Sequence, residues 1–313
     1  MNDNVLSVWH KGEVSIQKQA GTYERMAEIG PKFIREFMPE QDRDFFSALT
    51  MIYIGYVDHS GQIRASILFG AANFIQSPTN TELIINTQHT LGDLITDDIK
   101  LGDRVGLLGI EFDTKRRNRA NAIVTDVNQK SIRLSILQSY GNCPKYIQPK
   151  SFVRNHSYGE FPLATDQCLN QADKDFISSA DAFFIASYFD DGSQDNKSGA
   201  DISHRGGSAG FVSINSKGQL LIDDYPGNGF FNTLGNLLEN PTASLLFCDW
   251  QNGHALHLTV SSQIIWHQDT NYSSDLLTTK KDTGSDEIKR TLCFTPKKVE
   301  RLLNGLAYRQ LAP

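Results

Sequence analysis

The chain has 313 residues, of which 36 are acidic and 30 basic, so its formal net charge is −6. This balance argues against a general nucleic-acid-binding protein, which normally carries a basic face. Apolar residues make up 39% of the chain, which excludes a largely disordered protein and suffices for one large domain or two ordinary ones.

The cysteines and the apolar runs point to a cellular compartment. Four widely spaced cysteines include no C-x-x-C pair, so the sequence predicts neither a metal centre nor a disulfide framework. The first residues, MNDNVLSVWHKGEV, lack the apolar core of a signal peptide. The longest apolar runs, such as AFFIASYF at 182–189, are too short to cross a bilayer. We therefore expect a cytoplasmic protein with no nucleic-acid or membrane partner.

The first 45 residues show helical periodicity. Met26, Ile29, Phe33 and Phe37 recur at three- and four-residue steps with charged residues between them. Because proline interrupts helices, Pro31 and Pro39 are expected to divide this stretch into short helices.

The pattern then changes to short strands. TMIYIGYVDHSGQIRASILFG, at 50–70, predicts two strands joined by a turn at 58–61. Further strand candidates rich in Ile, Leu and Val lie at 81–88, 104–112, 121–127 and 131–137. No strand alternates regularly with a long amphipathic helix, so a doubly wound parallel sheet is disfavoured and an antiparallel barrel or sandwich is favoured.

An internal repeat divides the chain into two similar modules. NFIQ at 73–76 resembles GFVS at 210–213, LGDL at 91–94 resembles LGNL at 234–237, and RVGLLGIEF at 104–112 aligns without gaps on TASLLFCDW at 242–250. We expect the two LG-x-L segments to begin helices. Two barrel modules in one chain should pack on each other as a pseudo-dimer that covers exposed sheet edges.

These patterns give the following domain organisation. The prediction is an N-terminal helical segment at 1–45, modules at 46–150 and 165–270, and a helical tail at 271–313. The tail is predicted from the spacing of Leu302, Leu303 and Leu306, and it is free to pack on the barrel or on a second chain. A homodimer is therefore compatible with the sequence.

The second module contains a candidate phosphate site, DISHRGGSAGF at 201–211. Arg205 offers a planar fork of donors, and Gly206 and Gly207 allow the backbone to approach an anion as a nest of N–H groups. His204 adds a donor whose charge depends on pH. The stretch opposite in the first module, Ser66 to Phe69, carries no cation, so we expect one phosphate site per chain.

A second anion-binding element follows about twenty residues later, in DYPGNGFFNTLGNLLENP at 224–241. Asn232 or Thr233 is suited to cap a short helix that Pro241 ends, and the start of a helix is itself an anion site. Each segment alone is more often an ordinary turn or a solvated surface. Their joint presence in one module favours a site.

Several of these motifs resemble a known family. DISHRGGSAGF, LLIDDYPGNGFFNTLGNLLENPTASLLFCDW, KRRNRAN and QSYGNCPKYIQ are similar to the pyridoxamine 5′-phosphate oxidase-like family of FMN-binding split barrels, in its tandem members of about 300 residues. The resemblance implies a mainly β fold with peripheral helices, in which tandem split β-barrels form an intramolecular pseudo-dimer and FMN lies between them.

The resemblance also implies roles for individual residues. Its phosphate ligands would be His204, Arg205, Gly206, Gly207, Asn228, Thr233, Gly235 and Asn236. Asp249 or Trp250 would lie near the ribityl chain or ring. Arg116, Arg117 and Arg119 would point at the shared cleft or stabilise the strand that lines it, and Lys145 and Tyr146 would reach the flavin or substrate. Two departures remove cations that are common in the family: Gly229 follows Asn228, and 258–266 reads LTVSSQIIW.

The resemblance implies an FMN-dependent oxidoreductase that acts on a small substrate, with NAD(P)H as a plausible electron donor. The sequence identifies no catalytic residue. A flavin carrier without catalysis is the second hypothesis. A haem-handling split barrel with His254 and His257 is the third, and it is the weakest because these two positions of one strand face opposite sides.

Overall fold

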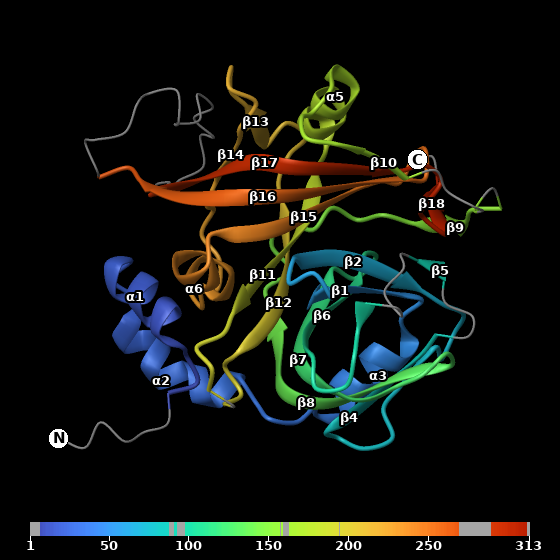
Figure 1. Ribbon diagram of the computed structural model, residues 1–313. Coiled ribbons are helices and arrows are strands. Elements are labelled where there is room, and N and C mark those ends of the chain that lie inside the picture. The colour runs from blue at the N-terminus through green and yellow to red at the C-terminus, as the bar shows by residue number, and fades with distance from the viewer. Residues whose placement is uncertain are drawn as a thin grey trace.

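The computed structural model describes residues 7–87, 91–92, 98–156, 158, 163–193, 195–268 and 289–311. Within these residues the protein is mainly β, with antiparallel sheets and helices at the periphery (Figure 1). This architecture confirms the predicted fold class. The expected end of the second module and the start of the tail, at 269–288, lie outside the described residues.

Three helices precede the first strand, as expected. They are α1 (Lys11–Gln19), α2 (Tyr23–Phe33) and α3 (Glu40–Ala48). Pro39 is the N-cap of α3, but Pro31 lies inside the last turn of α2 and does not separate two helices.

The first sheet curls into the lower barrel of Figure 1. Its strands are β1 (Met51–Val57), β2 (Ile63–Phe69), β3 (Ile75–Gln76), β4 (Glu82–Asn86), β5 (Leu91–Gly92), β6 (Arg104–Glu111), β7 (Arg116–Val127) and β8 (Ser131–Asn142). They lie in the order β3-β4-β8-β7-β6-β1-β2-β5. Leu91 and Gly92 pair with β2, and the rest of the first LG-x-L segment, where a helix was expected to begin, lies outside the described residues.

The second sheet contains the strands of the second module. They are β10 (Leu163–Asp166), β11 (Ala182–Phe189), β12 (Gly199–Gly206), β13 (Val212–Ile214), β14 (Leu220–Asp223), β15 (Thr242–Asp249), β16 (His254–Trp266) and β17 (Arg290–Leu302). Their order is β12-β11-β15-β16-β17-β14-β13, with β10 added beside β17. Two helices accompany them, α5 (Gln171–Ser179) and α6 (Asn232–Glu239), and β9 (Phe152–Arg154) pairs with β18 (Tyr308–Gln310).

The predicted C-terminal helix is wrong where the structure describes it. Residues 290–302 form β17, which pairs with β16 from Ala255 to Trp266 and with β14. Leu302 is buried by this pairing, whereas Leu303 is 45% exposed. The leucine spacing suited a helix, but long-range pairing on both sides of the strand overrides local propensity. The second module therefore includes β17.

The repeat of sequence corresponds to a repeat of structure. In the first module β1 pairs with β2 and β6, and in the second module β11 pairs with β12 and β15. Tyr53 opposes Leu108 in the first sheet as Phe184 opposes Leu246 in the second. The rings of Tyr53 and Phe184 stack on each other with centroids 3.5 Å apart. Equivalent residues thus meet at the pseudo-twofold axis, and the two modules form the expected intramolecular pseudo-dimer.

The strand registers also identify the equivalent of each site residue. Phe69 opposes Met51, and Gly206 opposes the equivalent Ala182, so Phe69 is the counterpart of Gly206. Arg205 therefore corresponds to Leu68, one position away from the alignment expected from sequence. The counterpart positions on β2, Leu68 and Phe69, carry no cation, as the sequence predicted.

Close packing between the modules leads to a prediction about Gly106 of β6. A Cβ atom at this position would lie 2.7 Å from the Cα atom of Asp201 in β12. Gly106→Ala should therefore separate the modules locally and lower the free energy of unfolding by on the order of 1–3 kcal/mol. Chemical denaturation measures the change. Gly227→Ala, where a Cβ meets nothing within 4 Å, should leave the unfolding midpoint unchanged, and an equal loss in both variants would contradict this explanation.

A second prediction concerns His10, which joins α1 to α6. Its Nε2 lies 2.9 Å from Asn236 Oδ1, its ring stacks on Phe189, and burial lowers its pKa from 6.5 to about 4. Between these values only the unfolded chain takes up a proton. The neutral His10 imidazole therefore makes its full contribution to the free energy of unfolding above pH 6.5, and this contribution is lost as pH falls towards 4.

The wild type should therefore lose about 2 kcal/mol more stability between pH 7 and pH 5 than His10→Gln, which cannot titrate. Urea denaturation at the two pH values tests this difference. The same pH dependence in both proteins would rule out His10 as its source.

Candidate functional site

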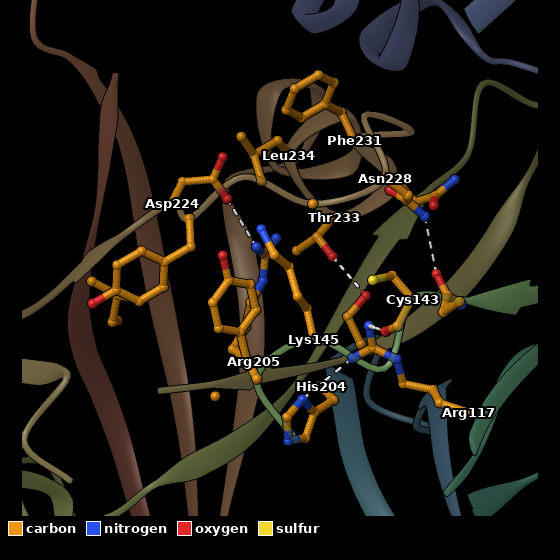
Figure 2. A pocket seen from close by; sticks show the side chains of 18 of the residues that line it. Arg117, Cys143, Lys145, His204, Arg205, Asp224, Asn228, Phe231, Thr233 and Leu234 are labelled. Atoms are coloured by element: carbon orange, nitrogen blue, oxygen red, sulfur yellow. Dashed lines mark hydrogen bonds and ion pairs between the residues drawn. The ribbon is translucent and has the colours of Figure 1, made fainter. Parts of the chain in front are cut away.

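A cavity of about 130 Å³ lies between the two modules. Its walls come from β7 and the segment after β8 in the first module, and from β12, the segment between β14 and α6, and the first turn of α6 in the second (Figure 2). The cavity exists only because the modules face each other. Of the residues expected at the phosphate, cleft or flavin, the cavity is lined by Arg117, Arg119, Lys145, Tyr146, His204, Arg205, Gly206, Asn228 and Thr233.

The β12 wall carries the predicted His-Arg-Gly sequence. His204 is buried, and its Nδ1 lies 3.3 Å from Nη1 of Arg117. Burial and the positive charges of Arg117 and Arg205 hold the pKa of His204 well below its usual value, so the imidazole is neutral at pH 7. Gly206 has no room for a side chain, because a Cβ would lie 2.4 Å from the carbonyl oxygen of Tyr146. The glycine thus permits close contact between the modules.

Arg205 belongs to a buried charge cluster. Its Nη1 donates to Oδ1 of Asp224 at 2.8 Å, as Figure 2 shows. The other carboxylate oxygen of Asp224 accepts from Nε and Nη2 of Arg290, at 3.1 and 2.7 Å. Arg290 lies between the rings of Phe231 and Trp266, with its Cζ 4.8 and 4.7 Å from their centroids. Two arginines thus share one carboxylate, and two members of this cluster, Arg205 and Asp224, line the cavity.

The first module supplies the opposite wall. Arg117 donates to the carbonyl oxygen of Cys143, and Asn228 donates to Asn142 Oδ1 at 3.0 Å (Figure 2). The Tyr146 hydroxyl donates to the carbonyl oxygen of Pro226 at 3.2 Å, and its ring stacks on Tyr225 with centroids 5.3 Å apart. The contacts of Asn228 and Tyr146 cross from one module to the other.

Helix α6 begins at the cavity, but not with the expected cap. The N-cap is Phe231 in the left-handed conformation, with φ 61°, and its side chain makes no cap hydrogen bond. Thr233 lies within the helix and donates to Ser203 Oγ at 2.9 Å, and Asn232 donates to Glu13. In the part of the chain that the structure describes, no side chain accepts from the first-turn N–H groups, at the end of the helix that attracts anions.

A buried polar layer adjoins this wall and includes Arg119, which also lines the cavity. Arg119 of β7 forms an ion pair with Asp201 of β12, and its Nη1 donates to Asn232 Oδ1 at 3.3 Å. Burial raises the pKa of the neighbouring Glu13 to about 8. The layer fixes the position of α6 against the first module.

Several donors around the cavity have no hydrogen-bond partner among the described residues. They are Nε of Arg117, Nε of Arg119, Nδ2 of Asn142, Nε2 of His204 and Nε of Arg205, all buried. Buried donors are normally satisfied. These five atoms belong to residues that line one cavity, from both modules, and a ligand with acceptor oxygens would satisfy them.

The remaining predicted residues lie outside this cavity. The N–H group of Gly207 donates to the carbonyl oxygen of Asp181, and neither Gly206 nor Gly207 has a positive φ, so the predicted nest is absent. Gly235 packs against Glu13, where a Cβ would lie 2.6 Å from Glu13 Cγ. The side-chain amide of Asn236 donates to Ser187.

Three more predicted residues have structural surroundings elsewhere. Arg116 donates to the carbonyl oxygen of Gln41 and lies over the ring of Phe45. Asp249 accepts from the N–H groups of a tight turn at 251–252. Trp250 is buried against Phe69, Phe112 and Phe152. This aromatic cluster contains Phe69, the counterpart of Gly206.

Sequence reasoning missed Asp224 and Arg290. Asp224 lies in a motif that was singled out for its glycines and cap residues, and Arg290 lies in the strand that was expected to be a helical tail. A single sequence gives no signal for a carboxylate that two distant arginines share.

The histidines of the haem hypothesis have other partners. His254 Nδ1 accepts from the N–H of Asn304, and His257 Nδ1 lies 3.1 Å from the carbonyl oxygen of Ala65. Neither lines the cavity. Within the described residues no group of three or more His, Cys, Asp or Glu is arranged to hold a metal, and no helix is both long and apolar enough to span a bilayer.

Comparison with known proteins gives only distant similarity. No family model and no curated protein sequence matches the chain. A crystal structure of a HupZ variant from Group A Streptococcus matches 33% of this chain and 98% of its own, with 9% identity and a TM-score of 0.26. A putative pyridoxamine 5′-phosphate oxidase from Corynebacterium glutamicum matches 46% of this chain and 94% of its own, with 14% identity and a TM-score of 0.29. At these values neither structure bears on function.

Proposed function

We propose that this protein is an FMN-binding flavoprotein that holds the phosphate end of FMN in the cavity between its modules. The observation that carries the proposal is the set of five buried, unpartnered donors on residues that line the cavity. They lie beside the uncapped first turn of α6, so side-chain and backbone donors would serve the same anion.

The charge of the cavity supports an anionic ligand. Its lining contains Arg117, Arg119, Lys145 and Arg205 against the carboxylates of Asp223 and Asp224, so it is net positive in an acidic chain. The cluster of Arg205, Asp224 and Arg290 also holds two positive charges against one negative charge. Since buried charge is costly unless paired, an anion at Arg205 would stabilise the cluster.

The residues fit a phosphate better than they fit a complete flavin. Arg205, Arg117 and His204, with the α6 backbone, would hold the phosphate. Gly229 replaces a cation that the resemblance leads one to expect, but Arg290 and Lys145 bring charge to the same region from other segments. The cavity is smaller than the roughly 300–1,000 Å³ typical of ligand pockets, so the ring would lie at or beyond its mouth.

FMN, when bound, supplies hydride-transfer chemistry. The protein would then be an oxidoreductase that orients the cofactor against a small substrate, with NAD(P)H as a candidate electron donor. The second candidate is a flavin carrier without catalysis, which the same donors would support. The haem alternative gains nothing from His254 and His257, which are engaged elsewhere.

The absorption spectrum of the purified protein separates these functions. We expect flavin bands at close to one FMN per chain, because the counterpart of Arg205 is Leu68. Bleaching by NADH under anaerobic conditions would identify the enzyme, and unresponsive flavin bands would identify the carrier. A Soret band without flavin would overturn the proposal.

Removal of Arg205 tests the phosphate assignment directly. Arg205→Ala should weaken FMN binding roughly 10- to 100-fold, because it removes charge-assisted hydrogen bonds, and should leave riboflavin binding unchanged. Titration with flavin fluorescence measures both. The matched control is Arg133→Ala, which removes an arginine paired with Glu82 outside the cavity.

Arg64 would be a poor control, because it pairs with the buried Glu300 at the module interface. Equal retention of FMN by the Arg205 and Arg133 variants would refute the phosphate assignment.

A further inference from the structure

The carboxylate of Asp224 lies in the lining of the cavity that we propose to be an anion site. Asp224 lines the cavity, and its side chain is only 4% exposed. It is held at both oxygens, by Arg205 on one side and by Arg290 on the other. Figure 2 shows Arg205 directed towards Asp224. The lining of the cavity thus includes a negatively charged side chain, the carboxylate of Asp224.

Asp224 engages the same side chain that the ligand needs. Nη1 of Arg205 donates to Asp224, while Nε of Arg205 is buried without a partner among the described residues. Arg205 is also the more exposed of the two arginines, with 23% of its side chain accessible against 8% for Arg290. An incoming anion would therefore compete for Arg205, and Arg290 would stay with Asp224.

We propose that Asp224 is a specificity-determining residue that competes with the ligand for Arg205 and restricts the cavity to ligands with a single phosphate. This inference rests on the proposed function, because it requires an anionic ligand in the cavity. One phosphate is attracted by the unpartnered donors of Arg117, His204 and Arg205. A second phosphate beside it would bring additional negative charge close to a buried carboxylate, and the repulsion is strong because water does not screen it.

The charge of the ligand should therefore set the size of the effect. Asp224→Asn keeps the shape and one acceptor oxygen of the side chain and removes its negative charge. Inorganic phosphate should bind about tenfold more tightly to this variant than to the wild type, and pyrophosphate should gain more than phosphate. Riboflavin, which carries no phosphate, should bind equally to both proteins.

The control is Asp173→Asn. Asp173 is also a buried carboxylate paired with an arginine, since Arg301 donates to it from Nε at 2.7 Å, and it lies outside the cavity. This variant loses the same charge and a similar ion pair, so its phosphate affinity should equal that of the wild type.

Isothermal titration with phosphate, pyrophosphate, FMN and FAD measures the affinities. Equal gains for phosphate and pyrophosphate would overturn the selectivity, and weaker phosphate binding by Asp224→Asn would show that Asp224 only positions Arg205. If the wild type binds FMN through Arg205 and Asp224→Asn changes nothing, this inference fails and the proposed function stands. If neither protein binds phosphate or FMN, both fail.

Protein stability gives an independent readout. Without Asp224 the two arginines face each other, so phosphate should raise the melting temperature of Asp224→Asn more than that of the wild type or Asp173→Asn. A variant that stays unfolded at every phosphate concentration would assign Asp224 a purely structural role and overturn the inference.

Discussion

The stacking of Tyr53 on Phe184 fixes how the two modules face each other, and the cavity depends on this arrangement. The two rings are equivalent residues of the repeat and lie on β1 and β11, each of which is paired with a strand on both sides. Around them, glycines on β1 and β6 allow the backbone of β12 to approach closely. This approach places Arg117 of the first module beside His204 of the second. A small displacement of one module would separate the donors that line the cavity.

The modules share a fold but differ in what fills their equivalent positions. Where the second module has Arg205 and Gly206, the first has Leu68 and Phe69. Phe69 lies in an aromatic cluster with Trp250 and Tyr308. Polar groups thus surround an open cavity on one side of the pseudo-twofold axis, and aromatic rings pack on the other. The difference arises from a few side chains, because the strand pairing is the same on both sides.

The sequence predicts best what local pattern and repetition determine. The strands of the first module, the repeat and the cationic segment at His204 and Arg205 follow from residues close together in the chain. The partners of those residues do not. Asp224 holds Arg205 and Arg290 from separate segments of the chain, and β17 forms because β14 and β16 pair with it on both sides. Trp250 aligned with a family position, but its packing partners come from the first module.

The charged residues at the interface between the two modules do not follow the pseudo-twofold symmetry. Asp201, which pairs with Arg119, occupies the position equivalent to Arg64, which pairs with Glu300. Two copies of the first module assembled in this geometry would bring Arg119 against Arg64, two cations in a buried site. The two modules are therefore not interchangeable. A second copy of the first module could not take the place of the second module, because the buried charges are complementary only between unlike modules. The single chain thus joins two modules that need each other as partners.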